Sequence, residues 1–334
     1  MADVEPPRPR PSHFTREELE RVILGDQPGL TSTDVASAAG VTVEQARRLW
    51  RALGFPDAGE QAAFNDADLI ALSTVIGAVE SGAIDFDTAV RMTRALGQTM
   101  ARLADWQVAT LAPRVEELES GAEATGSRIG SALRLAEEVG VPFERLLIYS
   151  WRRHLAAAVG RVEALGAADE DLHTTQTTVG FADLVAFTAL SNEIDEARLG
   201  DMVEVFESRC ADVVAGHHGR VIKTLGDSVL FVSEDPVQAL EIAFDIVGVI
   251  GHDPRLPDVR LGLASGSVIT RLGDVFGPPV NLAARLTAVA RRNRVIIDHA
   301  TADRLPPEEY ETRPLPARPV RGFGLVEPVA ARRR

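Results

Sequence analysis

The chain has 334 residues, of which 45% are hydrophobic and 25% are charged, and its formal net charge at pH 7 is −14. That length is enough for two domains. The acidic balance argues against a general nucleic-acid or anionic-membrane surface, but it allows a nucleotide that arrives with its cations. The single cysteine, Cys210, excludes an internal disulfide and is typical of a reducing cytoplasm.

The N-terminal residues do not have the pattern of a signal peptide. Residues 1–13 are rich in proline and lack an apolar core, so we expect a disordered tail and not a signal peptide. No stretch reaches the roughly 20 apolar residues of a membrane-spanning helix. These features predict a cytoplasmic protein without a membrane span.

Helix signals run through residues 14–165. Thr15 to Glu18 has the pattern of a capping box, and residues 31–34 and 42–45 open two more short helices. Gly40 and Gly54 are typical helix stops. Further helical patterns cover residues 66–79, 85–111, 128–138 and 143–165, and Pro142 starts the last of these. We therefore predict an all-helical domain.

The pattern changes after residues 166–175, a small and acidic stretch that we interpret as a linker. β-branched runs follow at residues 177–185, 220–224, 229–232, 259–264, 268–271 and 295–298, with helical patterns at 196–216, 236–250 and 279–291. Two βαβ-type units with short hairpins at 226–227 and 265–266 predict an α+β, ferredoxin-like core with the order βαββαβ.

Two aspartates, Asp183 and Asp227, lie where apolar strand runs break into turns. One such residue alone is most often a turn aspartate that caps its own backbone. Two strand-end carboxylates can instead converge on a pair of divalent cations such as Mg²⁺ or Mn²⁺, with substrate phosphates completing the shell. After Asp183, the backbone N–H groups of Ala186, Phe187 and Thr188 lead into a helix and could hold phosphates.

Lys223 and Asp274 could form a base-reading pair. A lysine donates to an unprotonated ring nitrogen, and an aspartate accepts from an exocyclic amine. Adenine offers that acceptor and that donor, whereas guanine offers the opposite pattern. If both residues line one pocket, the pair predicts adenine over guanine; the alternative for Lys223 is a solvated strand lysine.

A third group of polar residues suits a triphosphate. Asn281 and Arg285 are four residues apart and share a helix face. Arg285 carries a fixed charge suited to phosphate oxygens, and Asn281 can orient a ribose oxygen. Arg321 is a further phosphate candidate, with a surface turn charge as its alternative.

Residues from about 175 to 330 resemble the catalytic domain of class III nucleotidyl cyclases. The matching strings are Phe181 to Leu184, Lys223 to Asp227, Asp274 to Gly277 and Asn281 to Arg285. The resemblance implies a cyclase catalytic domain at residues 176–330 that converts ATP to 3′,5′-cyclic AMP and pyrophosphate. It also implies two metal ions and a head-to-tail homodimer with composite active sites.

By position, Asp183 and Asp227 match the two metal aspartates of that family, and Leu184 matches a backbone metal ligand. In the family these come from one subunit of the dimer. The alanine at position 186 departs from the usual glycine of the phosphate loop, and Phe276 replaces a more usual tyrosine or tryptophan.

The other matching residues come from the second subunit in that family. Lys223 and Asp274 match the adenine-selecting pair, and Asn281 and Arg285 match the transition-state pair. Arg321 matches a basic phosphate contact. Since no key polar position is missing, we expect an active adenylyl cyclase; guanylyl cyclase activity, a silent signalling or DNA-binding protein and a diguanylate-type synthase are the rivals.

The helical half more loosely resembles the regulatory domains of mycobacterial-type adenylyl cyclases, some of which respond to pH or fatty acids. We expect residues 143–165 to transmit a signal to the catalytic domain, and His154 and His173 are candidates for a pH switch. A cluster of apolar residues is a candidate fatty-acid pocket, with ordinary core as the alternative: Leu69, Ile70, Leu72, Val75, Ile76, Val79 and Val90.

Residues 30–54 of the helical half have the outline of a helix-turn-helix with basic residues Arg47, Arg48 and Arg51. Many helical domains contain this outline. The surrounding acidic residues and the strongly acidic chain make nucleic-acid binding an unfavoured interpretation.

Overall fold

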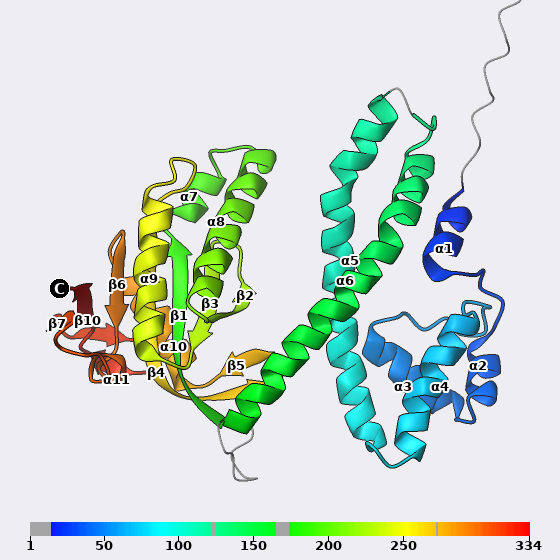
Figure 1. The fold of residues 1–334 in the computed structure, drawn as a ribbon, viewed down its shortest axis with the longest axis horizontal. Coiled ribbons are helices and arrows are strands. Elements are labelled where there is room, and N and C mark those ends of the chain that lie inside the picture. Colours follow the sequence, from blue (N-terminus) through cyan, green and yellow to red (C-terminus); the bar gives the residue numbers. More distant parts are fainter. Residues whose placement is uncertain (1–14, 122–123, 165–173, 272) are drawn as a thin grey trace, which may run out of the picture. The chain divides into compact units, whose positions relative to one another are not determined.

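The computed structural model describes residues 15–121, 124–164, 174–271 and 273–334 (Figure 1). The chain divides into two compact units, Met1–Gly160 and Arg161–Arg334. The predicted tail (1–13), most of the predicted linker (166–175) and His173 lie outside the described residues, so the expectations for them stay predictions.

The first unit is helical, as its capping signals predict. Thr15, Thr31 and Thr42 each form a capping box. The threonine side chain accepts from the backbone N–H of the third helical residue, and the side chain of that residue accepts from the threonine N–H. The helices are α1 (Arg16–Leu24), α2 (Ser32–Ala38), α3 (Val43–Leu53), α4 (Asp66–Glu80), α5 (Phe86–Ser120) and α6 (Arg128–Ala164), the last of which passes into the second unit.

Helices α2 to α5 surround the core of this unit. Trp50 stacks on Phe64 with ring centroids 4.2 Å apart. Helix α5 crosses α3 closely at Gly97, where an added Cβ would lie only 2.3 Å from the Leu53 carbonyl oxygen. A glycine is therefore required at this crossing, and any side chain there would force the two helices apart.

One prediction for this half was wrong in its boundaries. The structure has no separate helix beginning at Phe143, because α6 runs without a break from Arg128 to Ala164, through Pro142. A proline removes one backbone donor from a helix and usually ends or kinks it. Here the flanking turns are rich in leucine, glutamate and arginine, which favour helix strongly enough to continue on both sides.

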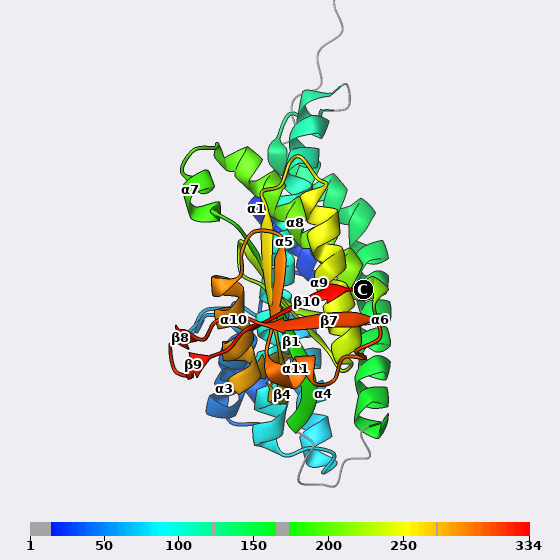
Figure 2. The ribbon, with the colours of Figure 1, turned by 90° about the vertical axis from the view of Figure 1, so that its left-hand side faces the viewer.

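The second unit is built on one mixed sheet (Figures 1 and 2). Its strand order is β2-β3-β1-β4-β6-β10-β7, and β5 pairs with β4. The strands are β1 (Thr174–Leu184), β2 (Arg220–Thr224), β3 (Ser228–Ser233), β4 (Val259–Arg271), β5 (Asp274–Phe276), β6 (Arg294–Ile297), β7 (Tyr310–Pro314) and β10 (Val329–Arg333). A separate pair consists of β8 (Arg318–Val320) and β9 (Gly324–Val326).

The helices of this unit cover both faces of the sheet. They are α7 (Phe187–Ser191), α8 (Glu196–Gly216), α9 (Pro236–Gly251), α10 (Pro278–Val289) and α11 (His299–Ala302). Figure 2 shows α9 and α10 on opposite sides of the strands. The chain order β1-α8-β2-β3-α9-β4 with the sheet order β2-β3-β1-β4 confirms the predicted ferredoxin-like core.

The hairpin predicted at residues 226–227 is present, whereas the one predicted at 265–266 is not. Strand β4 continues through Ser265 and Gly266, and both pair with β1. Gly266 serves a close contact and not a turn, because an added Cβ would lie 2.8 Å from Cγ of Pro279 on α10. In the described parts of the chain, no helix is both long and apolar enough to cross a membrane.

Candidate active site

The first site aspartate, Asp183, lies near the C-terminal end of β1. Its neighbours Ala182 and Leu184 are buried in the core that packs against α8 and α9. Since side chains alternate along a strand, Asp183 faces the opposite side of the sheet. There one carboxylate oxygen accepts from the Ser228 hydroxyl at 2.5 Å, and the other accepts from Nε of Arg260 at 2.7 Å.

The second aspartate, Asp227, lies in the turn between β2 and β3. Gly226 has a φ of 70°, which suits glycine, and the Leu184 N–H donates to the Asp227 carbonyl at 2.9 Å. This backbone contact joins the turn to the end of β1. Partial burial raises the pKa of Asp227, and the negative charge of Asp183 raises it further.

These two carboxylates suit divalent cations. Burial is the main cause of the raised pKa of Asp227 and the charge of Asp183 is the second, and a bound cation would offset both by favouring the charged carboxylate. Arg260 already supplies a positive charge to Asp183, with its Nη2 also 2.7 Å from that carboxylate. No group of three or more histidine, cysteine, aspartate or glutamate side chains could hold a metal among the described residues, so substrate oxygens or water would have to complete the shell.

Lys223 and Asp274 meet although they are 51 residues apart. Nζ of Lys223 donates to Asp274 at 2.6 Å, and both side chains are partly buried. Asp274 opens β5, which pairs with the outer end of β4, and a register shift in β2 lies between Val221 and Lys223. The two residues are therefore in direct contact, and their reading of a base stays a prediction.

Lys223 has a further distinction that the sequence interpretation missed. It is the only lysine in the chain, whose other basic side chains of fixed charge are all arginine. Lysine and arginine differ in donor geometry, and lysine presents a compact, rotatable ammonium group. The single lysine of the chain therefore lies in contact with Asp274.

The residues after Asp183 form a tight turn into the short helix α7. Ala186 has φ 59° and ψ 26°, in the left-handed region, and its carbonyl accepts from the N–H groups of Ala189 and Leu190. The N–H groups of Phe187 and Thr188 open this helix and have no acceptor within it. A left-handed alanine costs roughly 1–2 kcal/mol, so the departure from glycine carries strain.

Asn281, Arg285 and Arg321 are exposed. Asn281 and Arg285 lie one turn apart on α10, whose opposite face is buried through Ala283, Leu286 and Thr287. In the described part of the chain, neither has a side-chain hydrogen bond or an ion pair. Arg321 lies in the turn between β8 and β9. The structure therefore brings Asp183 and Asp227 together at the end of β1, and Lys223 into contact with Asp274. The other three predicted residues, Asn281, Arg285 and Arg321, face outward.

Arg260 and Ser228 contact Asp183 but were not among the predicted site residues. Arg260 interrupts the apolar run from Val259 to Ala264, and a charge in such a strand is a signal that could have been used. Ser228 directly follows Asp227. Its role depends on the pairing of β3 with β1, which the sequence pattern alone does not give.

A family description, the adenylate and guanylate cyclase catalytic domain, matches residues 171–329. An adenylate cyclase of Streptomyces coelicolor is 40% identical over 343 residues, which cover 95% of this chain and 89% of that protein. This chain belongs to the adenylate and guanylate cyclase family. Members of this family generally use divalent metal cations.

Other relatives extend the similarity over the helical half. An adenylate cyclase of Glutamicibacter nicotianae is 36% identical over 330 residues, covering 94% of this chain and 81% of that protein. The pH-sensitive adenylate cyclase MT1302 of Mycobacterium tuberculosis is 30% identical over 296 residues, covering 85% and 72%. The solved adenylyl cyclase CyaB from P. aeruginosa has a TM-score of 0.44 at 20% identity, covering 48% of this chain and 94% of that one.

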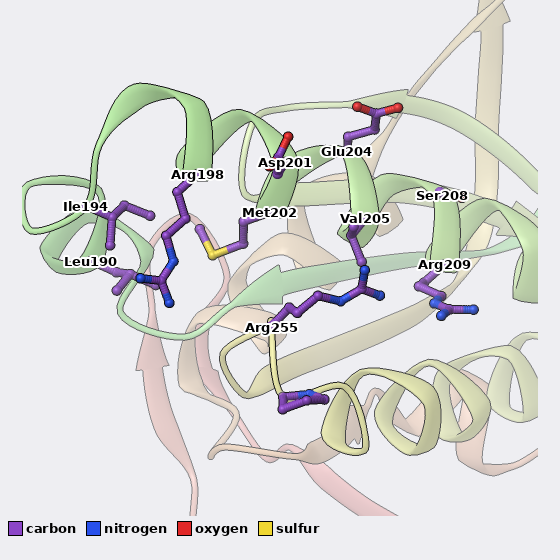
Figure 3. A pocket seen from close by; sticks show the side chains of 11 residues that line it. Leu190, Ile194, Arg198, Asp201, Met202, Glu204, Val205, Ser208, Arg209 and Arg255 are labelled. Atoms are coloured by element: carbon purple, nitrogen blue, oxygen red, sulfur yellow. The ribbon is translucent and has the colours of Figure 1, made fainter.

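A cavity of about 670 Å³ in the second unit contains none of these candidate residues (Figure 3). It lies between α7, α8 and the loop before β4. Apolar side chains from Leu190, Ile194, Met202 and Val205 line it together with charges of both signs.

The helical unit gives no support to a fatty-acid pocket among the proposed apolar residues. Leu69, Leu72, Val75, Ile76 and Val90 pack into one hydrophobic core. Ile70 instead points outward, with 66% of its surface exposed. Five of the seven residues therefore belong to ordinary core, which was the alternative interpretation.

The arginines of the helix-turn-helix outline are neutralised by acidic residues. Arg48 pairs with Asp87 at 2.7 Å and Arg51 with Glu44 at 2.7 Å. Arg47 lies 3.8 Å from Asp57. A phosphate backbone would have to compete with these carboxylates for the three arginines.

Proposed function

We propose that this protein is an adenylate cyclase that converts ATP to 3′,5′-cyclic AMP and pyrophosphate. The observation that carries the proposal is the Lys223–Asp274 pair, at 2.6 Å, in a domain that also presents two strand-end carboxylates. The named relatives from Streptomyces coelicolor and Glutamicibacter nicotianae support adenine as the base.

The carboxylate end of β1 would hold the cations. Asp183 and Asp227 would bind two divalent cations, with the Leu184 carbonyl as a backbone ligand; these cations supply activation of the ribose 3′-oxygen and neutralisation of the triphosphate. Ser228 orients Asp183, and Arg260 keeps its charge balanced before cations arrive.

The reaction exchanges one P–O bond for another and releases a proton. The 3′-hydroxyl gives its proton to water as its oxygen attacks the α-phosphorus, and the bond from that phosphorus to the bridging oxygen breaks, so that pyrophosphate leaves with the electron pair. Phe187 and Thr188 offer backbone N–H groups to the phosphates. Asn281 orients the ribose, and Arg285 donates to the phosphoryl oxygens where charge develops.

Base selection requires the Lys223–Asp274 pair to open. Lys223 then donates to the unprotonated ring nitrogen of adenine, and Asp274 accepts from the 6-amino group. The two residues exchange their contact with each other for two contacts with the base. Guanine would place a donor against the lysine and an acceptor against the aspartate, so it is disfavoured.

Two copies of the chain would complete each site. Asp183 and Asp227 would come from one copy, and Lys223, Asp274, Asn281 and Arg285 from the other, with Arg321 as a further phosphate contact. The exposure of Asn281 and Arg285 supports this arrangement, since an unpaired arginine on an exposed helix face is available to a ligand or partner.

The single lysine provides a direct test. The purified full-length protein is assayed with ATP or GTP and Mn²⁺, and the product is identified by mass spectrometry. In parallel, an amine-acylating reagent labels the protein in three samples that contain Ca²⁺ and either ATP, GTP or no nucleotide. We expect cyclic AMP from ATP and protection of Lys223 by ATP but not by GTP. Equal labelling of Lys223 in all samples would contradict its place in the adenine pocket.

We also propose that the helical unit makes activity depend on pH through His154, which is exposed on α6. The similarity to a relative named as pH-sensitive supports this regulation. His154→Ala should flatten the pH profile of cyclic AMP production between mildly acidic and neutral pH. His252→Ala, which changes an exposed histidine of the other unit, is the control, and identical profiles for both variants would contradict the proposal.

A further inference from the structure

The cavity of about 670 Å³ in Figure 3 contains none of the residues proposed for the reaction. It lies in the second unit, between the end of α7, one side of α8, and Pro254 and Arg255 in the loop before β4. We call it the α8 cavity. Its volume falls within the roughly 300–1,000 Å³ usual for sites that bind small molecules. It is therefore large enough for a ligand of its own, separate from the substrate.

The floor of the α8 cavity is apolar. Leu190 comes from α7, Ile194 from the loop after it, and Met202 and Val205 from α8. Met202 is buried, and its flexible thioether can adapt to the shape of a ligand. Met202 and Val205 are three residues apart, so they share a side of the helix and span only about 4.5 Å along it. This surface suits a compact apolar body and not a long chain.

Three arginines border this apolar surface, namely Arg198 and Arg209 on α8 and Arg255 in the loop. Two acidic residues of α8 also line the cavity. Figure 3 shows that the carboxylates of Asp201 and Glu204 point to the other side of α8, away from Arg255. The charges that face the apolar floor are therefore basic, although the chain as a whole has a net charge of −14.

These three arginines are only partly balanced. Arg255 pairs with Asp253 at 2.6 Å, and Arg209 lies 3.9 Å from the same carboxylate. Among the described residues, the exposed side chain of Arg198 has neither a hydrogen bond nor an ion pair. One carboxylate among three arginines leaves an excess of positive charge, so the cavity attracts an anion.

The α8 cavity is connected through α7 to the turn that follows β1. Leu190 lines the cavity, and its N–H donates to the Ala186 carbonyl at 3.1 Å. Ala186 is the left-handed residue that begins α7, three residues after Asp183. A ligand that packs against Leu190 would therefore favour one arrangement of this turn. Any effect of that arrangement on substrate affinity would be reciprocal, so that substrate also strengthens binding of the ligand.

We propose that the α8 cavity binds a small carboxylate with a compact apolar body, such as an aryl-substituted short-chain acid, and that this ligand strengthens the binding of ATP. The carboxylate accepts from the guanidinium fork of Arg198, which is free to form a bidentate pair. The apolar body packs on Met202 and Val205. The effect on ATP rests on the proposed cyclase function, whereas binding of the ligand does not.

Methyl NMR of the full-length protein, labelled at its methionine methyl carbons, tests the binding. Met202 is the only methionine in residues 161–334, and Met92 and Met100 on α5 are internal controls. Titration with 4-phenylbutyrate should shift the Met202 signal saturably and leave the two controls in place; Met202→Leu assigns the signal. The uncharged 4-phenyl-1-butanol should bind at least about tenfold more weakly. No saturable shift of Met202 with the acid would overturn the proposal.

Arg198→Gln tests the recognition of the carboxylate, and Arg304→Gln, an exposed arginine elsewhere in the same unit, is the matched control. We expect 4-phenylbutyrate to bind Arg198→Gln about tenfold more weakly than the parent and the control. The alcohol should bind all three proteins alike, because it lacks the charge. Equal affinity of the acid for all three would remove Arg198 from the site and overturn the proposal.

Steady-state kinetics test the effect on ATP. Saturating 4-phenylbutyrate should lower KM for ATP about fivefold in the parent, and the same concentration should change KM much less in Arg198→Gln. An unchanged KM in a parent whose Met202 signal shifts would overturn the connection through Leu190. A parent protein that binds the acid but makes no cyclic AMP would refute the proposed function and leave the binding site standing.

Discussion

The two sides of the candidate site differ in how completely one copy of the chain prepares them. At the carboxylate end of β1, Asp183 contacts both Ser228 and Arg260, and Asp227 is held by a backbone contact to Leu184. On α10, Asn281 and Arg285 are exposed, without a side-chain partner in the described residues. The first side is organised before any ligand arrives, and the second is not.

This difference fits the chemistry proposed for each side. Two neighbouring carboxylates repel unless something positive lies beside them, so the fold provides Arg260 until cations bind. An arginine that must meet charge developing on a phosphoryl group is best left unpaired, since a resident carboxylate would compete with the substrate. The experiments below test whether each side behaves in this way.

The largest effect is expected at the carboxylate side. Asp227→Ala should lower cyclic AMP production by about a thousandfold or more, because it removes a proposed ligand of both cations. Asp212→Ala, an exposed aspartate of α8, is the matched control and should keep its activity. Circular dichroism checks that both variants fold. Turnover by folded Asp227→Ala close to the parent rate would remove Asp227 from the metal site.

Mixing inactive variants tests whether the two sides come from different copies. Asp183→Ala mixed with Arg285→Ala should recover about a quarter of the parent activity, because half the dimers are mixed and each has one intact site of two. Asp183→Ala mixed with Asp227→Ala changes the same side in both proteins and should recover nothing. Equal recovery in the two mixtures, with heterodimers verified by mass spectrometry, would contradict the composite site.

The Lys223–Asp274 pair is intermediate between the prepared carboxylate side and the unpaired residues of α10. Its two side chains contact each other, but this contact must open for the base. Lys223→Arg keeps the charge but changes the donor geometry, so it should lower kcat/KM for ATP by about ten- to a hundredfold. The ratio of ATP to GTP use should fall at the same time. A variant with parent selectivity would show that charge alone acts at this position.

The sequence predicted the aspartates and the Lys223–Asp274 pair because each lies at a strand end within a recognisable order of polar residues. It missed Arg260 because that role depends on the alignment of Asp183 opposite Arg260 in β1 and β4, a contact over 77 residues. It also placed a hairpin at Gly266, where the glycine instead permits contact with Pro279. A glycine's local signal does not distinguish a turn from a close approach.

The same limit of local sequence signals explains which predictions for the helical unit were right and which were wrong. Its caps predicted the helix starts, because a cap acts within four residues. The end of one helix was wrong at Pro142, where the favourable flanks outweighed one lost hydrogen bond. Seven apolar residues were ambiguous between pocket and core, since the same periodicity predicts both and only packing decides: Leu69, Ile70, Leu72, Val75, Ile76, Val79 and Val90.

Ala186 offers a smaller test of the turn that follows the carboxylate side. Ala186→Gly should relieve the left-handed strain and change Tm by no more than about 2 °C, because glycine's greater freedom in the unfolded chain offsets most of the gain. Ala186→Val should lower Tm by several degrees, since a β-branched side chain tolerates this conformation poorly. Thermal unfolding of both variants measures this, and equal Tm values would mean that the turn is not left-handed.

The smallest expected effect is on thermal stability. It separates the contribution of Asp227 to stability from its contribution to cation binding. Burial and Asp183 raise the pKa of Asp227, so its charged form is disfavoured in the folded protein. Stability is therefore lost as the pH rises through that pKa. Asp227→Asn removes the charge and should raise Tm by about 1–3 °C at pH 7 without cations.

The higher Tm of Asp227→Asn should approach that of the parent as the pH falls toward 3.8, the usual aspartate value, because the parent carboxylate then becomes neutral as well. With Mn²⁺ present the order should reverse, because only the parent gains the cations. A variant that is less stable than the parent at pH 7 without cations would show that Asp227 has a favourable partner and is not held against repulsion.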